Sequence, residues 1–465
     1  MFFQHIYERG LAQSSYFVGC QATKEALVID PKRDIDTYLE ISKKENLKIT
    51  HVAETHIHAD FLSGARELAH ATGAELLLSD EGGPDWLYLY PHTGLKAGQI
   101  FKVGNLKIQV MHSPGHTPEH ISFLLTDVPA GDVPVMMFTG DFVFVGDVGR
   151  PDLLEKAAGI KGTMEAGAKQ MFESLKKFKA LPDFIQVWPG HGAGSACGKA
   201  LGSVPTSTIG YQKLTNWALM YSDEKEFVKN LLDGQPEPPK YFAMMKHLNK
   251  TGAPLLNQIS IPKKLSAMEV KTALEEGVML VDTRPKKIFA EGHIPGAISI
   301  MDNTAFSTWA GWLLDYKKPF ILLAPESRIE NIQKALIRIG LDHALGYIAG
   351  VEEWVSEGGT LETLKQISAQ ELKPHIDRND VFTLDVRASS EYATGHLPNA
   401  VHIHGGYLVD NLNKIPTDKR IIVQCQGGDR SVTAASLLRS KGFKNVVNLS
   451  GGLDEWKRAG YPVVM

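Results

Sequence analysis

The sequence has few cysteines, no long apolar run and no large excess of charge of either sign. Its 465 residues include only three cysteines, Cys20, Cys197 and Cys425, so a disulfide framework is excluded and each is a buried residue or a reactive thiol. No apolar run approaches the roughly 20 residues of a membrane-spanning helix. The formal charge is −4, from 49 basic and 53 acidic residues, which excludes recruitment of nucleic acid or an anionic membrane by bulk charge.

The N-terminal segment MFFQHIYERG lacks the basic start, the long apolar stretch and the cleavage site of a secretory signal. We therefore expect a cytoplasmic protein with no nucleic-acid or membrane partner. The length favours about three domains.

Two stretches of the chain are similar to each other. The first, beginning at Val281, is VDTRPKKIFAEGHIPGAISI, and the second, beginning at Leu384, is LDVRASSEYATGHLPNAVHI. Farther along the chain, GVEEW follows the first stretch and GLDEW follows the second. A pattern shared over about a hundred residues indicates a duplicated domain rather than a short solenoid repeat. The corresponding residues, each pair separated by the same 103 positions, are Asp282 with Asp385, Arg284 with Arg387 and His293 with His396.

The repeat sets the predicted domain boundaries at residues 1–250, 262–360 and 366–465. Each copy alternates apolar strand-like runs with helix-like runs, which is typical of a parallel sheet covered by helices. The first domain also alternates strands (EALVID, LKIQVMHSPG, VMMFTGD) with a helix (FLSGARELAHATG). The segment DGQPEPPKYF interrupts the periodicity and leads into a predicted helical extension.

Histidine and aspartate gather in four clusters of the first domain. The clusters are THIHADF, HSPGHTPEH, FTGDF and WPGHG, and each follows an apolar strand-like run. Loops at strand ends are where α/β folds collect their ligands. Imidazole together with carboxylate favours a borderline metal such as zinc or iron over calcium or magnesium. The candidate ligands are His56, His58, Asp60, His112, His116, His120, Asp141 and His191.

At these residues the sequence resembles the metallo-β-lactamase superfamily, whose marks are T-H-x-H-x-D-H, P-G-H-T, G-D and G-H. The matches are Thr55 to Asp60, Pro114 to Thr117, Gly140-Asp141 and Gly190-His191. Two-metal hydrolases of this superfamily, such as glyoxalase II, place a histidine where this chain has Phe61. Because a phenyl ring cannot coordinate a metal, two-metal hydrolysis is disfavoured.

Two imidazoles and one carboxylate with open positions are the arrangement of non-heme Fe(II) oxygenases. The superfamily branch of this type is the persulfide dioxygenases. The resemblance implies one Fe(II) per chain held by His56, His116 and Asp141, with His58, Asp60 and His191 as outer residues or alternative ligands. His112 and His120 are then structural or channel residues. Arg150, in DVGRPD, corresponds to an arginine that helps these enzymes bind the thiol substrate; a surface ion pair is the alternative.

The thiol carrier stays open. Relatives that use glutathione have a tyrosine two residues after the last motif histidine, where this chain has Ala193. Glutathione, coenzyme A and another low-molecular-weight thiol are all candidates. Cys197 lies in the same glycine-rich run, as a sulfur relay or as a structural residue. Burial is favoured for Cys20.

In the last domain, VQCQGGDRS places Cys425 at the end of an apolar run, before a glycine-rich loop and a helix. Backbone N–H groups of such a loop and a helix N-terminus favour an anion and activate a thiol. This run resembles the rhodanese active loop. The resemblance implies Cys425 as nucleophile, Arg430 as a catalytic cation, and a substrate cradle of Gln426, Gly427, Gly428 and Asp429. Asp385, Arg387, Glu391 and His396 belong to the frame.

The first copy has this frame without a thiol. When Arg328 is aligned with Arg430, Leu323 stands opposite Cys425, so we expect an inactive rhodanese-like domain that serves as a spacer or docking surface.

The implied fold class is therefore α/β: an N-terminal metallo-β-lactamase αββα sandwich, then two rhodanese-like domains with parallel sheets. The implied activity is O₂-dependent oxidation of a thiol persulfide to sulfite, coupled to a sulfurtransferase that makes or uses thiosulfate. This is the chemistry of sulfide detoxification, and relatives imply a homo-oligomer. The alternatives are a glyoxalase II-like thioester hydrolase, a sulfur carrier with a silent metal domain, and a persulfide sensor.

Overall fold

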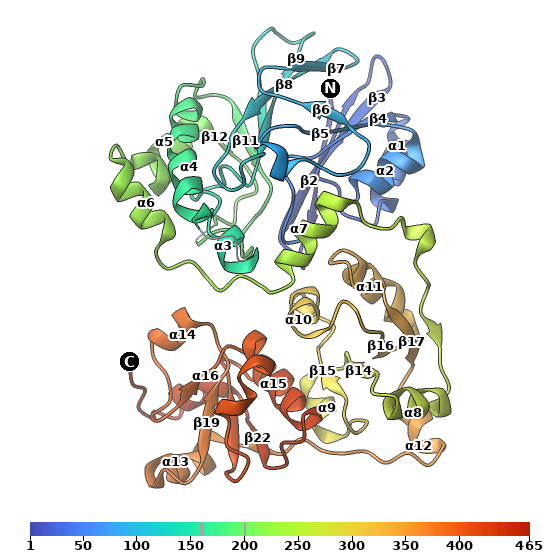
Figure 1. Ribbon diagram of the computed structural model, residues 1–465, viewed down its shortest axis with the longest axis vertical. Helices are drawn as coiled ribbons and strands as arrows, with labels where there is room; N and C mark the ends of the chain where they lie inside the picture. Colours follow the sequence, from blue (N-terminus) through green and yellow to red (C-terminus); the bar gives the residue numbers. More distant parts are fainter. Residues whose placement is uncertain (159–161, 200) are drawn as a thin grey trace. The chain divides into compact units, whose positions relative to one another are not determined.

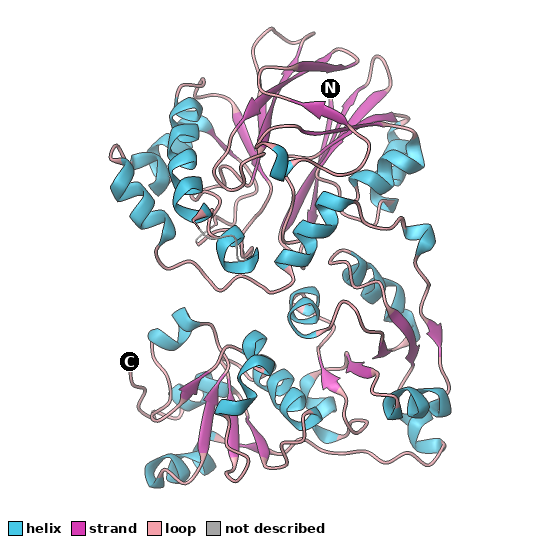
Figure 2. Cartoon of the chain, in the orientation of Figure 1, coloured by secondary structure: helices cyan, strands magenta, loops and turns pink. Residues whose placement is uncertain are grey.

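The computed structural model describes residues 1–158, 162–199 and 201–465. The chain forms two compact units (Figures 1 and 2): the first comprises residues 1–258 and 337–340, the second residues 259–336 and 341–465. Within the described residues, no helix combines the length and the apolar character needed to cross a membrane.

The first unit contains two six-stranded sheets packed face to face. Their inner faces supply one apolar core, in which Val18 and Leu27 of one sheet share a cluster with Val110 and Phe123 of the other. The strands of the first sheet are β1 (Phe2–Glu8), β2 (Gln13–Cys20), β3 (Glu25–Ile29), β4 (Lys48–Ala53), β5 (Glu75–Ser79) and β6 (Thr93–Leu95). Those of the second are β7 (Ile100–Val103), β8 (Leu106–His112), β9 (Ile121–Asp127), β10 (Met136–Gly140), β11 (Gln186–Pro189) and β12 (Ser207–Thr208).

Helices cover the outer faces of both sheets. Tyr38 and Leu68 pack α1 and α2 on the first sheet, and Phe172 and Phe227 pack α4 and α6 on the second, which completes the predicted αββα sandwich (Figure 1). The expected helical extension after DGQPEPPKYF is α7. The helices are α1 (Asp36–Glu45), α2 (Ala65–Thr72), α3 (Leu153–Ala158), α4 (Thr163–Lys179), α5 (Ile209–Thr215), α6 (Glu224–Leu232) and α7 (Phe242–Thr251), with 3₁₀ turns η1 (Pro84–Trp86), η2 (Trp217–Met220) and η3 (Leu256–Gln258).

The second unit contains the predicted duplication as two five-stranded parallel sheets. The first copy orders its strands β13-β17-β16-β14-β15 and the second β18-β22-β21-β19-β20, which is the same order. The first copy has β13 (Lys263–Lys264), β14 (Met279–Asp282), β15 (Ile298–Ser299), β16 (Phe320–Leu323), β17 (Ala344–Ile348), α8 (Ala267–Glu275), α9 (Lys286–Glu291), α10 (Phe306–Leu313), α11 (Glu326–Ile337) and α12 (Val351–Ser356). The second has β18 (Gln366–Ile367), β19 (Phe382–Asp385), β20 (Val401–His402), β21 (Ile421–Gln424), β22 (Val446–Leu449), α13 (Ala369–Arg378), α14 (Ser389–Ala393), α15 (Asp429–Ser440), α16 (Gly452–Arg458), η4 (Gly405–Tyr407) and η5 (Val409–Lys414).

Local interactions repeat between the copies as well. Ser266 begins α8 and Ser368 begins α13, each with a capping box to a glutamate three residues on. Arg284 pairs with Asp282 at 2.6 Å and Arg387 with Asp385 at 2.7 Å. The aspartate–arginine frame predicted from the repeat is therefore present in both copies.

Candidate functional site

Four strand ends bring the predicted metal-ligand residues together in the first unit. The loops after β4, β8, β10 and β11 carry His56, His116, Asp141 and His191, all of them buried. Gly140 precedes Asp141 with φ of +49°, and a Cβ there would lie 2.5 Å from Thr55 Oγ1. Glycine is therefore required for β10 to end against the Thr55–His56 loop.

Three of these side chains converge on one point. His116 Nε2 lies 3.5 Å and His56 Nε2 lies 4.0 Å from Asp141 Oδ2. Among the described residues, His56 Nε2 and both carboxylate oxygens of Asp141 have no hydrogen-bond partner, although all are buried. Buried polar atoms without a partner are costly unless a further group satisfies them. These donors therefore fit a metal ion, with two nitrogens and one oxygen.

Outer contacts turn the imidazoles toward this point. His116 Nδ1 donates to the carbonyl of Arg150 at 2.9 Å, which leaves the lone pair of Nε2 available to coordinate a metal. His120 Nε2 accepts the backbone N–H of Asp141 at 3.1 Å, so His120 is structural, as expected. Burial lowers the pKa of His116 and holds that of His56 well below its ordinary value. Both rings are then neutral, the form that binds metals.

A second group of donors lies beside the first. Ligand atoms of Asp60, His191 and Cys197 lie within 4.8 Å of one another, and His191 Nε2 is 3.2 Å from Asp60 Oδ2 and 3.4 Å from Asp141 Oδ1. Burial raises the pKa of the Cys197 thiol to about 12. The structure thus places the Cys197 thiol with Asp60 and His191, beside the first group of donors.

His58 points away from both groups. Its Nε2 lies 3.0 Å from Glu54 Oε2 and 3.2 Å from Asp30 Oδ1. The ring of Phe61 packs against the imidazole with centroids 4.4 Å apart. Phe61 therefore has a second role besides the absence of a ligand, because its ring packs on His58, whose Nε2 lies between the buried carboxylates of Glu54 and Asp30. Glu54, directly before THIHADF, and Asp30, the last residue of EALVID, were not among the predicted site residues.

Arg150 corrects the sequence analysis. Its guanidinium is fully buried, with Nε and Nη2 each donating to Asp152 at 2.7 Å and Nη1 donating to the carbonyl of Ala196 at 3.1 Å. The alternative of a surface ion pair is therefore wrong, because the pair with Asp152 is buried, whereas the substrate-binding role stays a prediction. Arg150 fixes the segment that carries Cys197 and, through its own carbonyl, the ring of His116.

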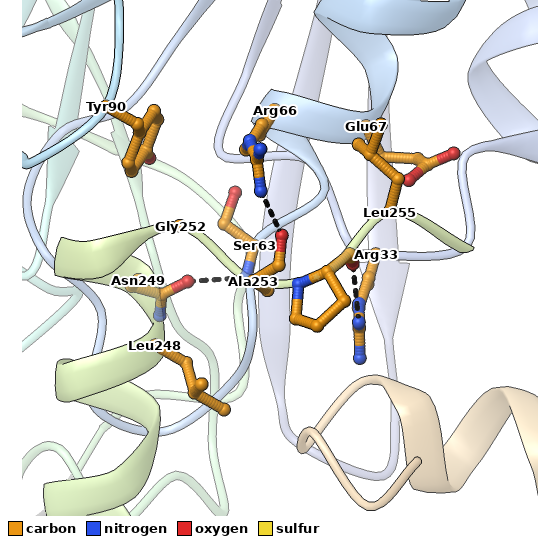
Figure 3. A pocket seen from close by; sticks show the side chains of 11 residues that line it. Arg33, Ser63, Arg66, Glu67, Tyr90, Leu248, Asn249, Gly252, Ala253 and Leu255 are labelled. Atoms are coloured by element: carbon orange, nitrogen blue, oxygen red, sulfur yellow. Dashed lines mark hydrogen bonds between the residues drawn. The ribbon is translucent and has the colours of Figure 1, made fainter. Parts of the chain in front are cut away.

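A small cavity in the first unit lies among Arg33, Ser63, Arg66 and Asn249 (Figure 3). Its volume of about 20 Å³ is close to that of one water molecule. Arg33 donates to the carbonyl of Pro254 at 2.9 Å and Arg66 to that of Ala253. These two hydrogen bonds hold the Ala253–Pro254 segment in place. The cavity itself is too small for a thiol substrate.

The thiol loop of the second unit runs from Cys425 at the end of β21 to Arg430 in the first turn of α15. The N–H of Gly428 donates to Cys425 Sγ at 3.1 Å, and the thiol donates to Ser431 Oγ at 3.4 Å. Gly428 has φ of +97°, a conformation that favours glycine. The loop therefore directs a backbone donor at a buried sulfur, as the sequence predicted, and Ser431 is an additional contact.

Arg430 faces Glu391 in a two-pronged ion pair, with Nη1 and Nη2 at 2.5 and 2.7 Å from the two carboxylate oxygens. Burial disfavours ionisation of Glu391, but the hydrogen bonds and charge of Arg430 outweigh it and lower the pKa of this carboxyl. Gln426 accepts from Arg387 at 3.3 Å and donates to Asp454. Glu391 thus holds a predicted catalytic residue instead of only supporting the fold.

The first copy differs at the corresponding loop. Strand register pairs Asp282 with Leu323 and Asp385 with Gln424, so Ala324, and not Leu323, stands where Cys425 is found. The loop from Ala324 to Arg328 is then one residue shorter than its counterpart. The expected Leu323 position was wrong because aligning the two arginines assumed loops of equal length.

Comparison with known families agrees with this architecture. Residues 9–191 match the metallo-beta-lactamase superfamily, and residues 266–357 and 368–459 each match the rhodanese-like domain. A crystal structure described as a metallo-beta-lactamase from Staphylococcus aureus subsp. aureus COL is 42% identical, with a TM-score of 0.68. The match covers 75% of this chain and 98% of that one.

Two curated relatives match separate parts of the chain. A hydroxyacylglutathione hydrolase of Rhodospirillum rubrum is 32% identical over 176 residues, which is 38% of this chain and 60% of the relative. A sulfurtransferase of Allochromatium vinosum is 31% identical over 102 residues, which is 22% of this chain and 95% of the relative. The chain thus spans less than two thirds of that hydrolase.

Proposed function

Because this chain belongs to the metallo-β-lactamase superfamily and carries two rhodanese-like domains, we propose that it is a persulfide dioxygenase joined to a thiosulfate sulfurtransferase. The observation that carries the proposal is the convergence of His56, His116 and Asp141 in one buried group, in which His56 Nε2 and both Asp141 carboxylate oxygens lack hydrogen-bond partners in the described chain. Two imidazoles and one carboxylate that leave open positions suit Fe(II) in oxygenases. Bound Fe(II) would supply the activation of O₂.

The overall oxidation is balanced with the persulfide as the electron donor. RSSH, O₂ and water give RSH, sulfite and two protons, and four electrons pass from sulfur to O₂. His56 and His116 act as neutral ligands, and the Arg150 carbonyl and Thr55 hydroxyl hold their rings in place, with His56 Nδ1 3.0 Å from Thr55 Oγ1. Burial of the whole cluster limits the access of bulk water to the site.

Sulfur transfer would take place at Cys425. The thiolate attacks the outer sulfur of thiosulfate, sulfite leaves with the electron pair of the S–S bond, and Cys425 carries a persulfide. A low-molecular-weight thiolate then takes that sulfur and restores the cysteine; the reverse sequence makes thiosulfate from sulfite and a persulfide. The Gly428 N–H at 3.1 Å supports negative charge on the attacking sulfur. Ala324 gives the first copy no nucleophile, so we assign it no transfer step.

The proposal specifies the carrier only as a low-molecular-weight thiol. Arg150 is buried against Asp152, so it leaves no free guanidinium for the carboxylates of glutathione or the phosphates of coenzyme A. Cys197 lies with Asp60 and His191, which supports its assignment as a sulfur-relay candidate next to the metal ligands. Its thiol needs a metal or a base to ionise, because burial raises its pKa to about 12.

A thioester hydrolase is the second candidate function. The cluster of Asp60, His191 and Cys197 beside Asp141 favours it, since these donors could hold a second metal even though Phe61 replaces the usual imidazole. The relative named hydroxyacylglutathione hydrolase supports the same alternative. In this case the chain would hydrolyse an S-acyl thiol without O₂.

Whether product formation from each substrate requires O₂ separates the two candidate functions. Protein loaded anaerobically with Fe(II) is given glutathione persulfide, coenzyme A persulfide or S-lactoylglutathione, each with and without O₂. The proposal expects sulfite only from a persulfide and only with O₂, and no thioester hydrolysis. Anaerobic hydrolysis of the thioester, with no O₂ uptake from either persulfide, would overturn the proposal in favour of the hydrolase.

A further inference from the structure

One peptide unit of the thiol loop is held from both sides. Its N–H, on Gly428, donates to Cys425 Sγ at 3.1 Å, and its carbonyl, on Gly427, accepts from Lys286 Nζ at 2.7 Å. Lys286 is the first residue of α9 and belongs to the first rhodanese-like copy, which lies in the same compact unit. A residue from the copy without a thiol therefore contacts the loop around the thiol of the other copy.

The geometry of a trans peptide explains how the contact of Lys286 with the Gly427 carbonyl affects Cys425. The N–H and C=O of a trans peptide point in opposite directions, so holding the carbonyl oxygen of Gly427 also directs the Gly428 N–H. Both flanking residues are glycines, which allow a peptide to rotate more easily than other residues do. If this peptide turned over, its carbonyl oxygen would face Cys425 Sγ and disfavour the thiolate. The Lys286 ammonium also polarises the peptide, which strengthens the opposite N–H as a donor.

Two further observations point the same way. Lys286 Nζ lies 2.5 Å from Asp429 Oδ1, so the ammonium is fixed at two points of the loop. Both groups are partly exposed, and such ion pairs contribute little to stability, so adhesion of the copies does not account for the lysine. In the repeat, Lys286 corresponds to Ser389, which shows that the shared frame does not require a lysine at this position.

We propose that Lys286 is a positioning residue for sulfur transfer, supplied by the copy that has no nucleophile of its own. The inference rests on the proposed sulfurtransferase function of Cys425. Lys286 keeps the Gly427–Gly428 peptide turned so that its N–H faces the sulfur, and Cys425 remains the residue that reacts. The first copy thus forms part of the active site and is more than a spacer.

Substitution in the full chain tests the proposal, and the neighbouring lysine provides the control. Lys286→Met removes the ammonium at similar length, Lys286→Arg keeps a cation, and Lys287→Met removes an exposed lysine whose Nζ lies 4.0 Å from Glu291 Oε1. Lys286 and Lys287 both line a cavity of about 390 Å³ with Gly428 and Val432, so either lysine could instead bind substrate. Separate kcat and KM values for thiosulfate distinguish the two roles.

Lys286→Met is expected to lower kcat for sulfur transfer about tenfold, the loss typical of one charge-assisted hydrogen bond, with KM within about twofold. Alkylation of Cys425 by iodoacetamide at pH 7, followed on its peptide by mass spectrometry, is expected to slow by a similar factor. Lys286→Arg should retain most of both rates and Lys287→Met all of them. Oxygen uptake by the first unit should stay unchanged in every variant, and an unchanged melting temperature of each variant shows that the second unit is folded.

Lys286→Met with kcat and alkylation equal to those of Lys287→Met would overturn the inference, as would a change confined to KM. A wild-type chain that transfers no sulfur from thiosulfate would overturn the proposed function instead. In that case the alkylation rates still decide whether Lys286 directs the peptide at Cys425.

Discussion

Phe61 and Ala324 mark two places where this chain lacks a side chain that its relatives' chemistry uses. Around Phe61, the neighbouring donors are kept: His56, Asp141 and His191 remain buried, with donor atoms that have no hydrogen-bond partner among the described residues. Around Ala324, the neighbours have changed: the loop is one residue shorter and Arg328 pairs with Asp302 at 2.7 Å. Pro325, which follows Ala324 directly, has no backbone N–H.

The difference teaches how to interpret a missing functional residue. Unpaired buried donors are unfavourable in an ordinary core, so their retention indicates that a ligand still satisfies them. Functional groups that have found new partners, or a loop that has been shortened, indicate that the original chemistry is gone. By this criterion we propose that the metal site keeps a function with a changed ligand set, and that the first rhodanese-like copy transfers no sulfur itself.

Removing a retained donor should have the largest effect. Asp141→Ala is expected to lower metal binding and O₂ uptake by more than about 100-fold, because losing a direct ligand costs more than losing an outer partner. Metal analysis and an oxygen electrode measure both. Asp132→Ala, at an exposed carboxylate, is the control, and sulfur transfer at Cys425 should persist in both variants. Normal O₂ uptake in Asp141→Ala would remove this residue from the site.

Restoring the missing imidazole should have a smaller effect. Phe61→His is expected to raise bound metal above one per chain, because Asp60, His191 and Cys197 already form a group of donors to which the new imidazole would add the missing motif ligand. Phe61→Leu keeps the position apolar and should leave the stoichiometry at one. Unchanged metal content in Phe61→His, or two metals in the wild-type chain, would contradict the one-metal interpretation of this position.

Restoring the missing thiol should have almost no effect. Ala324→Cys, made in a Cys425→Ser background, is expected to give no sulfur transfer from thiosulfate, because the shortened loop and Pro325 cannot direct the same N–H groups at the new sulfur. The assay is thiosulfate-dependent sulfite release, with the Cys425→Ser chain as control. Measurable recovery would show that the frame alone suffices and that our comparison of the two loops is wrong.

The fold and the grouping of most candidate metal donors could be predicted because each depends on short-range patterns. Alternating strands and helices, an internal repeat, and a donor after each strand are all visible along the chain. Contacts made over long separations were not visible: Lys286 meets Gly427 across 141 residues, and Arg150 meets the carbonyl of Ala196 across 46. The Ala324 position was missed because a one-residue shortening leaves no trace when two loops are aligned by their last arginine.

The central claim is that one chain holds two independent centres, a metal site in the first unit and a thiol in the second. Cys425→Ser tests it most directly, with O₂ uptake, sulfite and thiosulfate measured together on Fe(II)-loaded protein and a thiol persulfide. The account predicts wild-type O₂ uptake, one sulfite formed for each O₂ consumed, and no enzymatic thiosulfate. Loss of O₂ uptake together with thiosulfate would contradict it, because the two sites would then not be separate.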